Sequence, residues 1–141
     1  MKQSVMDIDM LKKAGKIVAQ VREETVKKIT EGTSFLDIIN FAESKTKELG
    51  GDVAWAQLSP TTTAAHFCPT EDNNPICKKG DLLKLDIGVH IEGNIADTAI
   101  TVAIDTNEYE DLIKCSEEAL EETLKLAKPG VKLKELGAKQ T

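Results

Sequence analysis

The strongest constraint on the fold is a run of alternating residues that begins at Leu83 and is interrupted once, by Glu-Gly-Asn, before it ends at Val102. The apolar positions of its first arm are Leu83, Leu85, Ile87, Val89 and Ile91. Alternation with a period of two predicts a β-strand with one apolar face, and residues of the opposite parity share the other face. The Gly-containing interruption is typical of a tight turn. The run therefore predicts an antiparallel hairpin.

The position of the turn decides which residues of the two arms lie opposite each other. A two-residue turn at Glu92-Gly93 pairs Leu85 with Ile100 and makes Asp97 a diagonal neighbour of Asp86 on one face. A turn one residue later, at the better hairpin dipeptide Gly-Asn, shifts the pairs but preserves the face. A three-residue turn would put the apolar sets on opposite faces. Apolar matching therefore favours the registers that bring Asp86 and Asp97 together.

Asp86 and Asp97 are the metal-ligand candidates that follow from this geometry. Two carboxylates on one sheet face repel each other unless a cation lies between them, and a pair of divalent metal ions is a common solution. The alternative is that both are polar residues on a solvated strand face, although Asp is disfavoured in strands. A metal site and a solvated face both remain open on this evidence.

Charge, hydropathy and cysteine content narrow the class of protein. The net charge of −6 argues against direct nucleic-acid binding, which normally requires a basic stripe. The 141 residues contain no apolar run of about 18 residues, and the first residues do not resemble a signal peptide. Cys68, Cys77 and Cys115 lack any C-x-x-C spacing and are expected to be reduced and structural. We expect a cytoplasmic protein without a membrane segment.

Helical spacing flanks the predicted strands. A first helix is expected to begin at Asp7 or Asp9 and to end at Gly32. Ser34-Asp37 resembles the capping box of a second helix, which should stop at Gly50. Residues 53–104 are predicted to form short strands separated by turns. Apolar residues return to helical spacing over residues 107–128. The expected class is α+β, with an antiparallel sheet covered by helices.

The sequence also matches itself at a constant offset of 98 residues. Glu23–Ile38 aligns with Glu121–Leu136, and five of the sixteen positions are identical. Two amphipathic helices drawn from the same limited set of residues would look alike as well, so chance similarity is the alternative. If the repeat is real, residues 1–105 form one half-repeat and residues 106–141 begin a second, interrupted one.

Several motifs resemble those of the methionine aminopeptidases, specifically the archaeal and eukaryotic type II branch of the pita-bread metallopeptidases. The segments that carry the resemblance are Ala14-Gly-Lys-Ile17, Glu48-Leu-Gly-Gly51, Ala64-Ala-His-Phe-Cys-Pro69, Gly80-Asp-Leu-Leu-Lys-Leu-Asp-Ile-Gly-Val-His-Ile91 and Ile95-Ala-Asp-Thr-Ala99. The resemblance implies a fold of two related halves, of which this chain would supply the N-terminal half and the start of the second.

The resemblance also implies a role for each candidate residue. Asp86 would bind one divalent metal ion and Asp97 would bridge two, with Co, Mn, Fe or Zn as the possible metals. His66 would act in catalysis by hydrogen-bonding the substrate or the tetrahedral intermediate. Trp55 stands where the family usually has Phe-Pro, beside the pocket for the substrate methionine. The implied reaction is removal of the initiator methionine from proteins and peptides.

The family completes its metal site with one histidine and two glutamates from the second half, and these are not encoded here. We therefore expect a heterodimer in which a C-terminal half chain supplies the remaining ligands. The alternative is a non-catalytic interaction module, or a homodimer of half-folds, without peptidase activity. Peptide and protein N-termini would be the substrates of the completed enzyme.

Overall fold

The computed structural model describes residues 6–139 and divides into two compact units, with the boundary between Thr106 and Asn107. Unit 1 contains α1 (Ile8–Val26), α2 (Phe35–Glu48), β1 (Asp52–Ser59), β2 (Leu82–Ile91) and β3 (Asn94–Ala103). Unit 2 contains α3 (Glu110–Leu126) and α4 (Leu133–Gly137). The predicted α+β class is confirmed. No helix among residues 6–139 is both long enough and apolar enough to span a membrane.

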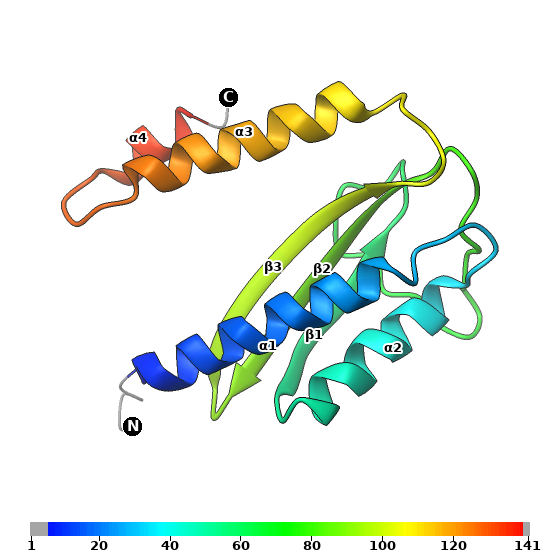
Figure 1. Ribbon diagram of the computed structural model, residues 1–141, viewed down its shortest axis with the longest axis horizontal. Coiled ribbons are helices and arrows are strands. Elements are labelled where there is room, and N and C mark those ends of the chain that lie inside the picture. Colours follow the sequence, from blue (N-terminus) through cyan, green and yellow to red (C-terminus); the bar gives the residue numbers. More distant parts are fainter. Residues whose placement is uncertain (1–5, 140–141) are drawn as a thin grey trace. The chain divides into compact units, whose positions relative to one another are not determined.

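Unit 1 consists of a helical layer on one face of a three-stranded antiparallel sheet (Figure 1). The strand order is β1-β2-β3, so β2 is the central strand. The core lies between the two layers and is built from residues with almost no exposed surface, among them Val21, Phe35, Ile38, Leu85 and Ile87. Burying each of these larger side chains contributes roughly 1.5–3 kcal/mol. Neither α1 nor α2, the two helices described in unit 1, covers the opposite face of the sheet.

The β2–β3 hairpin adopts the first of the predicted registers. Ile91 pairs with Asn94, so the turn is Glu92-Gly93, and Leu85 lies opposite Ile100. Glu92 and Gly93 have φ values of +50° and +81°, as a two-residue type I′ turn requires. The apolar residues of β2, together with Ile100 and Val102 of β3, therefore face the helices, and the opposite parity faces away from them.

Both predicted helix caps are present. The Asp7 carboxylate accepts hydrogen bonds from the backbone N–H groups of Asp9 (2.9 Å) and Met10 (3.2 Å) at the start of α1. At the start of α2, Ser34 Oγ accepts from the backbone N–H of Asp37 (3.1 Å) and donates to Asp37 Oδ2 (2.6 Å). Each cap satisfies backbone donors that the first helical turn leaves unpaired.

The first helix is shorter than the sequence predicted, because α1 ends at Val26 rather than at Gly32. Beyond Val26 the chain tightens into a turn in which the N–H of Ile29 donates to the Val26 carbonyl (3.0 Å). Gly32, at φ +86°, donates its N–H to the carbonyl of Cys77 (2.9 Å). Ile29 remains in the core, at 5% exposure. Ile29 fits the apolar spacing of the helix, so the sequence predicted a longer helix, but the backbone at Ile29 is no longer helical.

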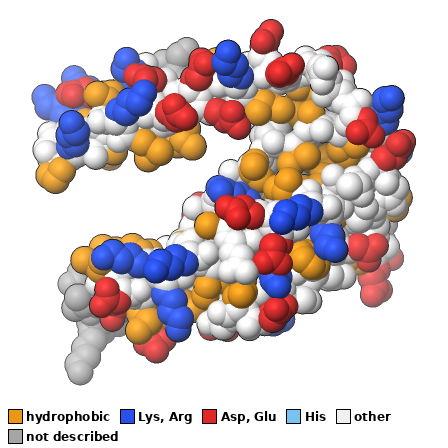
Figure 2. Space-filling model, viewed as in Figure 1, with side chains coloured by type: hydrophobic (Ala, Val, Ile, Leu, Met, Phe, Trp, Pro, Cys, Tyr) orange, Lys and Arg blue, Asp and Glu red, His pale blue; other side chains and the backbone are white. Residues whose placement is uncertain are grey.

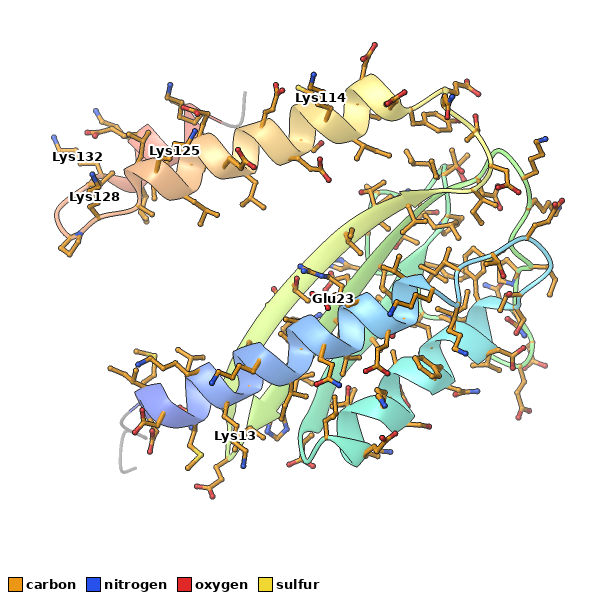
Figure 3. The ribbon with its side chains drawn as sticks, viewed as in Figure 1. Lys13, Glu23, Lys114, Lys125, Lys128 and Lys132 are labelled. Carbon is orange, nitrogen blue, oxygen red and sulfur yellow. The ribbon has the colours of Figure 1, made fainter. Side chains whose placement is uncertain are left out.

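Unit 2 is an amphipathic helix followed by a turn and a short helix, and none of the helical residues described in it is buried. Apolar side chains gather along one side of this unit (Figure 2). The large exposed ones are Leu112, Leu120, Leu124 and Leu133. Lys114 and Lys125 are exposed as well (Figure 3). An apolar stripe of this kind normally packs against another element.

Two backbone features recur at the offset of 98 residues found in the sequence. Gly32 and Gly130 have nearly the same φ, +86° and +92°. The next helix begins at Phe35 in the first case and at Leu133 in the second. A glycine turn followed by a helix start therefore occurs twice at the same spacing, which supports a repeat over an accidental similarity of composition.

Candidate metal centre

A cavity of about 350 Å³ lies in unit 1, and its lining comes from the face of the sheet opposite the helices and from the loop after β1. The lining residues are Trp55, Gln57, His66, Asp86 and Asp97. The structure thus brings together all four residues that the sequence predicted for the site, and it adds Gln57.

The hairpin register places the two aspartates as neighbours on this face. Asp86 lies opposite Ala99, and Asp97 lies opposite Gly88, so the two acidic residues are diagonal across β2 and β3. Diagonal neighbours in an antiparallel pair are about 7–8 Å apart at the backbone, within reach of longer side chains or of a shared ion. Asp86 is half-buried on the central strand, and Asp97 is exposed on the outer strand.

The electrostatics of the cavity are those of an uncompensated negative pair. Partial burial, together with the negative charge of Asp86, raises the pKa of the Asp97 carboxyl. Among the described residues that line the cavity there is no lysine or arginine. Lys84 lies on the same strand, but its ammonium donates to the carbonyl of Pro60 (2.6 Å), and burial lowers its pKa. The two carboxylates therefore favour an added cation.

The donor set fits a divalent cation in part. Carboxylate oxygens are suitable ligands for Mn, Fe, Co and Zn, especially when imidazole completes the site. Within residues 6–139, no group of three or more His, Cys, Asp or Glu side chains is placed to hold a metal ion. The described residues therefore supply two carboxylates here, which are fewer ligands than a transition-metal ion normally takes.

His66 reaches the cavity from the loop that follows β1. It is exposed and has a φ of +66°, which is uncommon for a residue with a side chain. The next residue anchors the loop, because Phe67 N–H donates to Ser59 Oγ (3.1 Å) and Leu58 N–H donates to the Phe67 carbonyl (3.0 Å). The Phe67 ring also packs edge-on against Phe35, with centroids 6.1 Å apart. The backbone of His66 is thus held while its imidazole remains accessible.

Trp55 contacts the candidate metal ligand directly. Its indole Nε1–H donates to Asp86 Oδ1 at 2.7 Å. The β1–β2 pairing is irregular between Val53 and Trp55, where the register shifts. An irregularity of this kind redirects the side chains around it. The sequence predicted Trp55 beside the substrate pocket, whereas its hydrogen bond to Asp86 was not foreseen.

Gln57 was missed by the sequence reasoning. It lies opposite Asp86 in the β1–β2 pair, and its Oε1 is buried with no hydrogen-bond partner among the described residues. An unpartnered buried acceptor in a cavity is suited to a donor on a bound molecule. The signal that could have found it is parity, since Gln57 is two residues from Trp55 on the same strand.

The histidine and cysteines outside the cavity have ordinary structural surroundings. His90 Nδ1 accepts from the N–H of Gly93 (3.3 Å) at the hairpin turn. Cys68, Cys77 and Cys115 are all free thiols, as expected. Burial raises the pKa of Cys77 to about 11, which keeps that thiol neutral and unreactive.

Comparison with known proteins identifies the family. Residues 9–140 match the model of metallopeptidase family M24. The chain belongs to family M24. A methionine aminopeptidase from Pyrococcus horikoshii is 46% identical to this M24 chain over 133 residues, which cover 94% of the chain and 45% of the relative. A methionine aminopeptidase from Methanothermus fervidus is 32% identical and is covered over 76% of its length.

The solved structures agree with the fold. The crystal structure of a methionine aminopeptidase from Thermotoga maritima superposes with a TM-score of 0.87 at 26% identity, covering 99% of this chain and 59% of that one. The M24 chain thus has the fold of the N-terminal part of the pita-bread enzymes, as the sequence motifs implied. It spans less than half the length of the Pyrococcus horikoshii relative.

Proposed function

We propose that this M24 chain supplies the N-terminal part of the active site of a methionine aminopeptidase, which hydrolyses the peptide bond after an N-terminal methionine. The observation that carries the proposal is the placement of Asp86 and Asp97 as diagonal neighbours on one face of the hairpin, in a cavity that His66 also lines. The relatives that are methionine aminopeptidases support the same reaction.

Each cavity residue has a proposed role. Asp86 and Asp97 would hold two divalent metal ions, which would lower the pKa of water enough for attack on a carbonyl near neutral pH. The accessible imidazole of His66 hydrogen-bonds the substrate carbonyl or the tetrahedral intermediate, where it would stabilise the charge that develops on oxygen. Trp55 and Gln57 form the wall of the cavity, and Trp55 lies beside the substrate side chain.

The remaining ligands must come from outside the described residues. We propose that they are supplied by a C-terminal half on another chain, in a heterodimer. The exposed apolar residues Leu120, Leu124 and Leu133 of unit 2 support this, because a second half would cover them. The glycine turn and helix start that recur at an offset of 98 residues support a second half-repeat in that position.

The test is reconstitution of the two halves. The chain is co-expressed with the C-terminal half of the Pyrococcus horikoshii relative, and release of methionine is measured on a peptide with N-terminal methionine and on the same peptide with N-terminal leucine. We expect methionine release by the pair and not by either half alone. Asp97→Asn should abolish release, whereas the matched variant Asp52→Asn, an exposed carboxylate on β1, should leave it unchanged.

Two outcomes would count against this function. A stable complex without methionine release in the presence of Mn²⁺, Co²⁺, Fe²⁺ or Zn²⁺ would favour the non-catalytic interaction module. Release that survives Asp97→Asn would remove the hairpin carboxylates from the mechanism.

A further inference from the structure

The hydrogen bond between Trp55 and Asp86 has a fixed direction and a short length. An indole Nε1–H is only a donor, and an ionised carboxylate is only an acceptor. The distance of 2.7 Å is in the range of charge-assisted hydrogen bonds, which are stronger than neutral ones. Both residues are half-buried, so water competes less for this contact than on an open surface.

The indole is held in place by the strand beneath it. A Cβ atom on Gly88 would lie 2.5 Å from Trp55 Cδ2 and Cε2 and 2.7 Å from Cε3, so the ring lies directly on the Gly88 backbone. Gly88 pairs with Trp55 on one side and with Asp97 on the other. The ring therefore lies in the same row of the sheet as Asp97 and next to the row of Asp86, and Gly88 leaves the space that it needs.

The contact leaves one oxygen of Asp86 available. Oδ1 accepts the indole N–H, and no hydrogen bond to Oδ2 occurs within residues 6–139. Because the hydrogen bond holds Oδ1, rotation of the Asp86 carboxylate about its side-chain bond is restricted. Its second oxygen, Oδ2, is therefore held in one direction. Partners of this kind orient metal ligands, and their removal typically weakens metal affinity about 10- to 100-fold.

We infer that Trp55 is a positioning residue for Asp86: its indole N–H fixes the carboxylate so that Oδ2 is presented to a divalent cation in the cavity. This rests on the proposed function, because it takes Asp86 as a metal ligand. It goes beyond that function by giving Trp55 a defined chemical task in addition to a place in the cavity wall.

The first arm of the test needs no metal. Trp55 is the only tryptophan in the chain, so it gives a single indole N–H cross-peak in a ¹H–¹⁵N NMR spectrum. We expect this peak to be shifted downfield and to move upfield in Asp86→Ala, which removes the acceptor. It should also move upfield in Gly88→Ala, which displaces the ring. The control Asp52→Ala, an exposed residue on the same strand as Trp55, should not move it.

The second arm measures the Mn²⁺ affinity of the complex between this chain and the C-terminal half of the Pyrococcus horikoshii relative, from the electron paramagnetic resonance signal of free Mn²⁺. Trp55→Phe keeps an aromatic ring over Gly88 but lacks the donor, and it should raise the dissociation constant about 10- to 100-fold. Gly88→Ala should weaken binding in the same direction with the indole still present. Asp52→Ala should bind Mn²⁺ as the wild type does.

The outcomes separate the two proposals. Equal Mn²⁺ affinity in Trp55→Phe and the wild type would overturn the positioning role and leave the metal site intact. An indole N–H chemical shift that does not change in Asp86→Ala would overturn the positioning role as well. Mn²⁺ binding by the wild type that is unaffected by Asp86→Ala would overturn the proposed metal site and, with it, this inference.

Discussion

Replacing Gly88 by alanine tests the packing on which the cavity depends. The new Cβ would lie 2.5 Å from two atoms of the Trp55 ring, about 1 Å closer than ordinary carbon–carbon contact. Overpacking of this kind costs about 1–3 kcal/mol. Replacing glycine by alanine inside a strand gains roughly 0.5–1 kcal/mol by itself. The difference between these two ranges is about 0–2.5 kcal/mol, so we expect Gly88→Ala to lower the free energy of unfolding by about 1 kcal/mol.

The effect of Gly88→Ala on the free energy of unfolding should change sign when the tryptophan is removed. In a Trp55→Ala background the clash is absent, so Gly88→Ala should stabilise unit 1 by about 0.5–1 kcal/mol. Urea unfolding followed by far-ultraviolet circular dichroism measures all four members of this double-mutant cycle, because that signal does not depend on Trp55. Residues in contact commonly show interaction free energies of about 0.5–3 kcal/mol in such a cycle.

Gly15→Ala is the matched control. Gly15 is in the interior of α1, and a Cβ there would meet no atom within 4 Å. Alanine should stabilise that helix by about 0.8–1 kcal/mol both in the wild type and in the Trp55→Ala background. The reasoning is refuted if Gly88→Ala has the same effect with and without Trp55, since the predicted loss depends wholly on the ring.

Three further predictions concern the turn, the thiols and a helix cap. Glu92 has a φ of +50°, so Glu92→Asn should stabilise the hairpin by about 0.5–1 kcal/mol in urea unfolding; destabilisation would contradict the turn type. Cys77 is buried with a pKa of about 11, so at pH 8 a thiol reagent should modify Cys68 and Cys115 quickly and Cys77 only on unfolding; three equal rates would contradict this. Ser34→Ala should cost about 1 kcal/mol of stability, and no loss would argue against the cap.

The hairpin could be predicted from the sequence because its signal is local. Alternation assigned Asp86 and Asp97 to one face, and this follows from the period of the strand alone. The turn was ambiguous, since the Gly-Asn dipeptide is a better hairpin turn than Glu92-Gly93. The structure uses Glu92-Gly93, which pairs Leu85 with Ile100 in the core. Apolar matching allows both turns, so it does not choose between them.

The cavity wall could be predicted only in part, because it depends on contacts between distant segments. The position of Trp55 over Gly88 depends on the β1–β2 register and on its irregularity after Val53, neither of which has a local signature. Parity places Gln57 on the same strand face as Trp55, but its position opposite Asp86 also depends on this register. The extra length assigned to the first helix had a different cause, since Ile29 is buried from a turn and apolar periodicity does not distinguish a turn from a helix.

The central claim is that Asp86 and Asp97 are metal ligands in a site completed by a second half. Native mass spectrometry of the chain co-expressed with the C-terminal half of the Pyrococcus horikoshii relative reports partner, stoichiometry and metal content in one mass. The account predicts a one-to-one complex carrying two divalent metal ions, which are lost in the Asp86→Asn, Asp97→Asn double variant. A complex without metal in the wild type, or one that keeps both ions in the double variant, would contradict it.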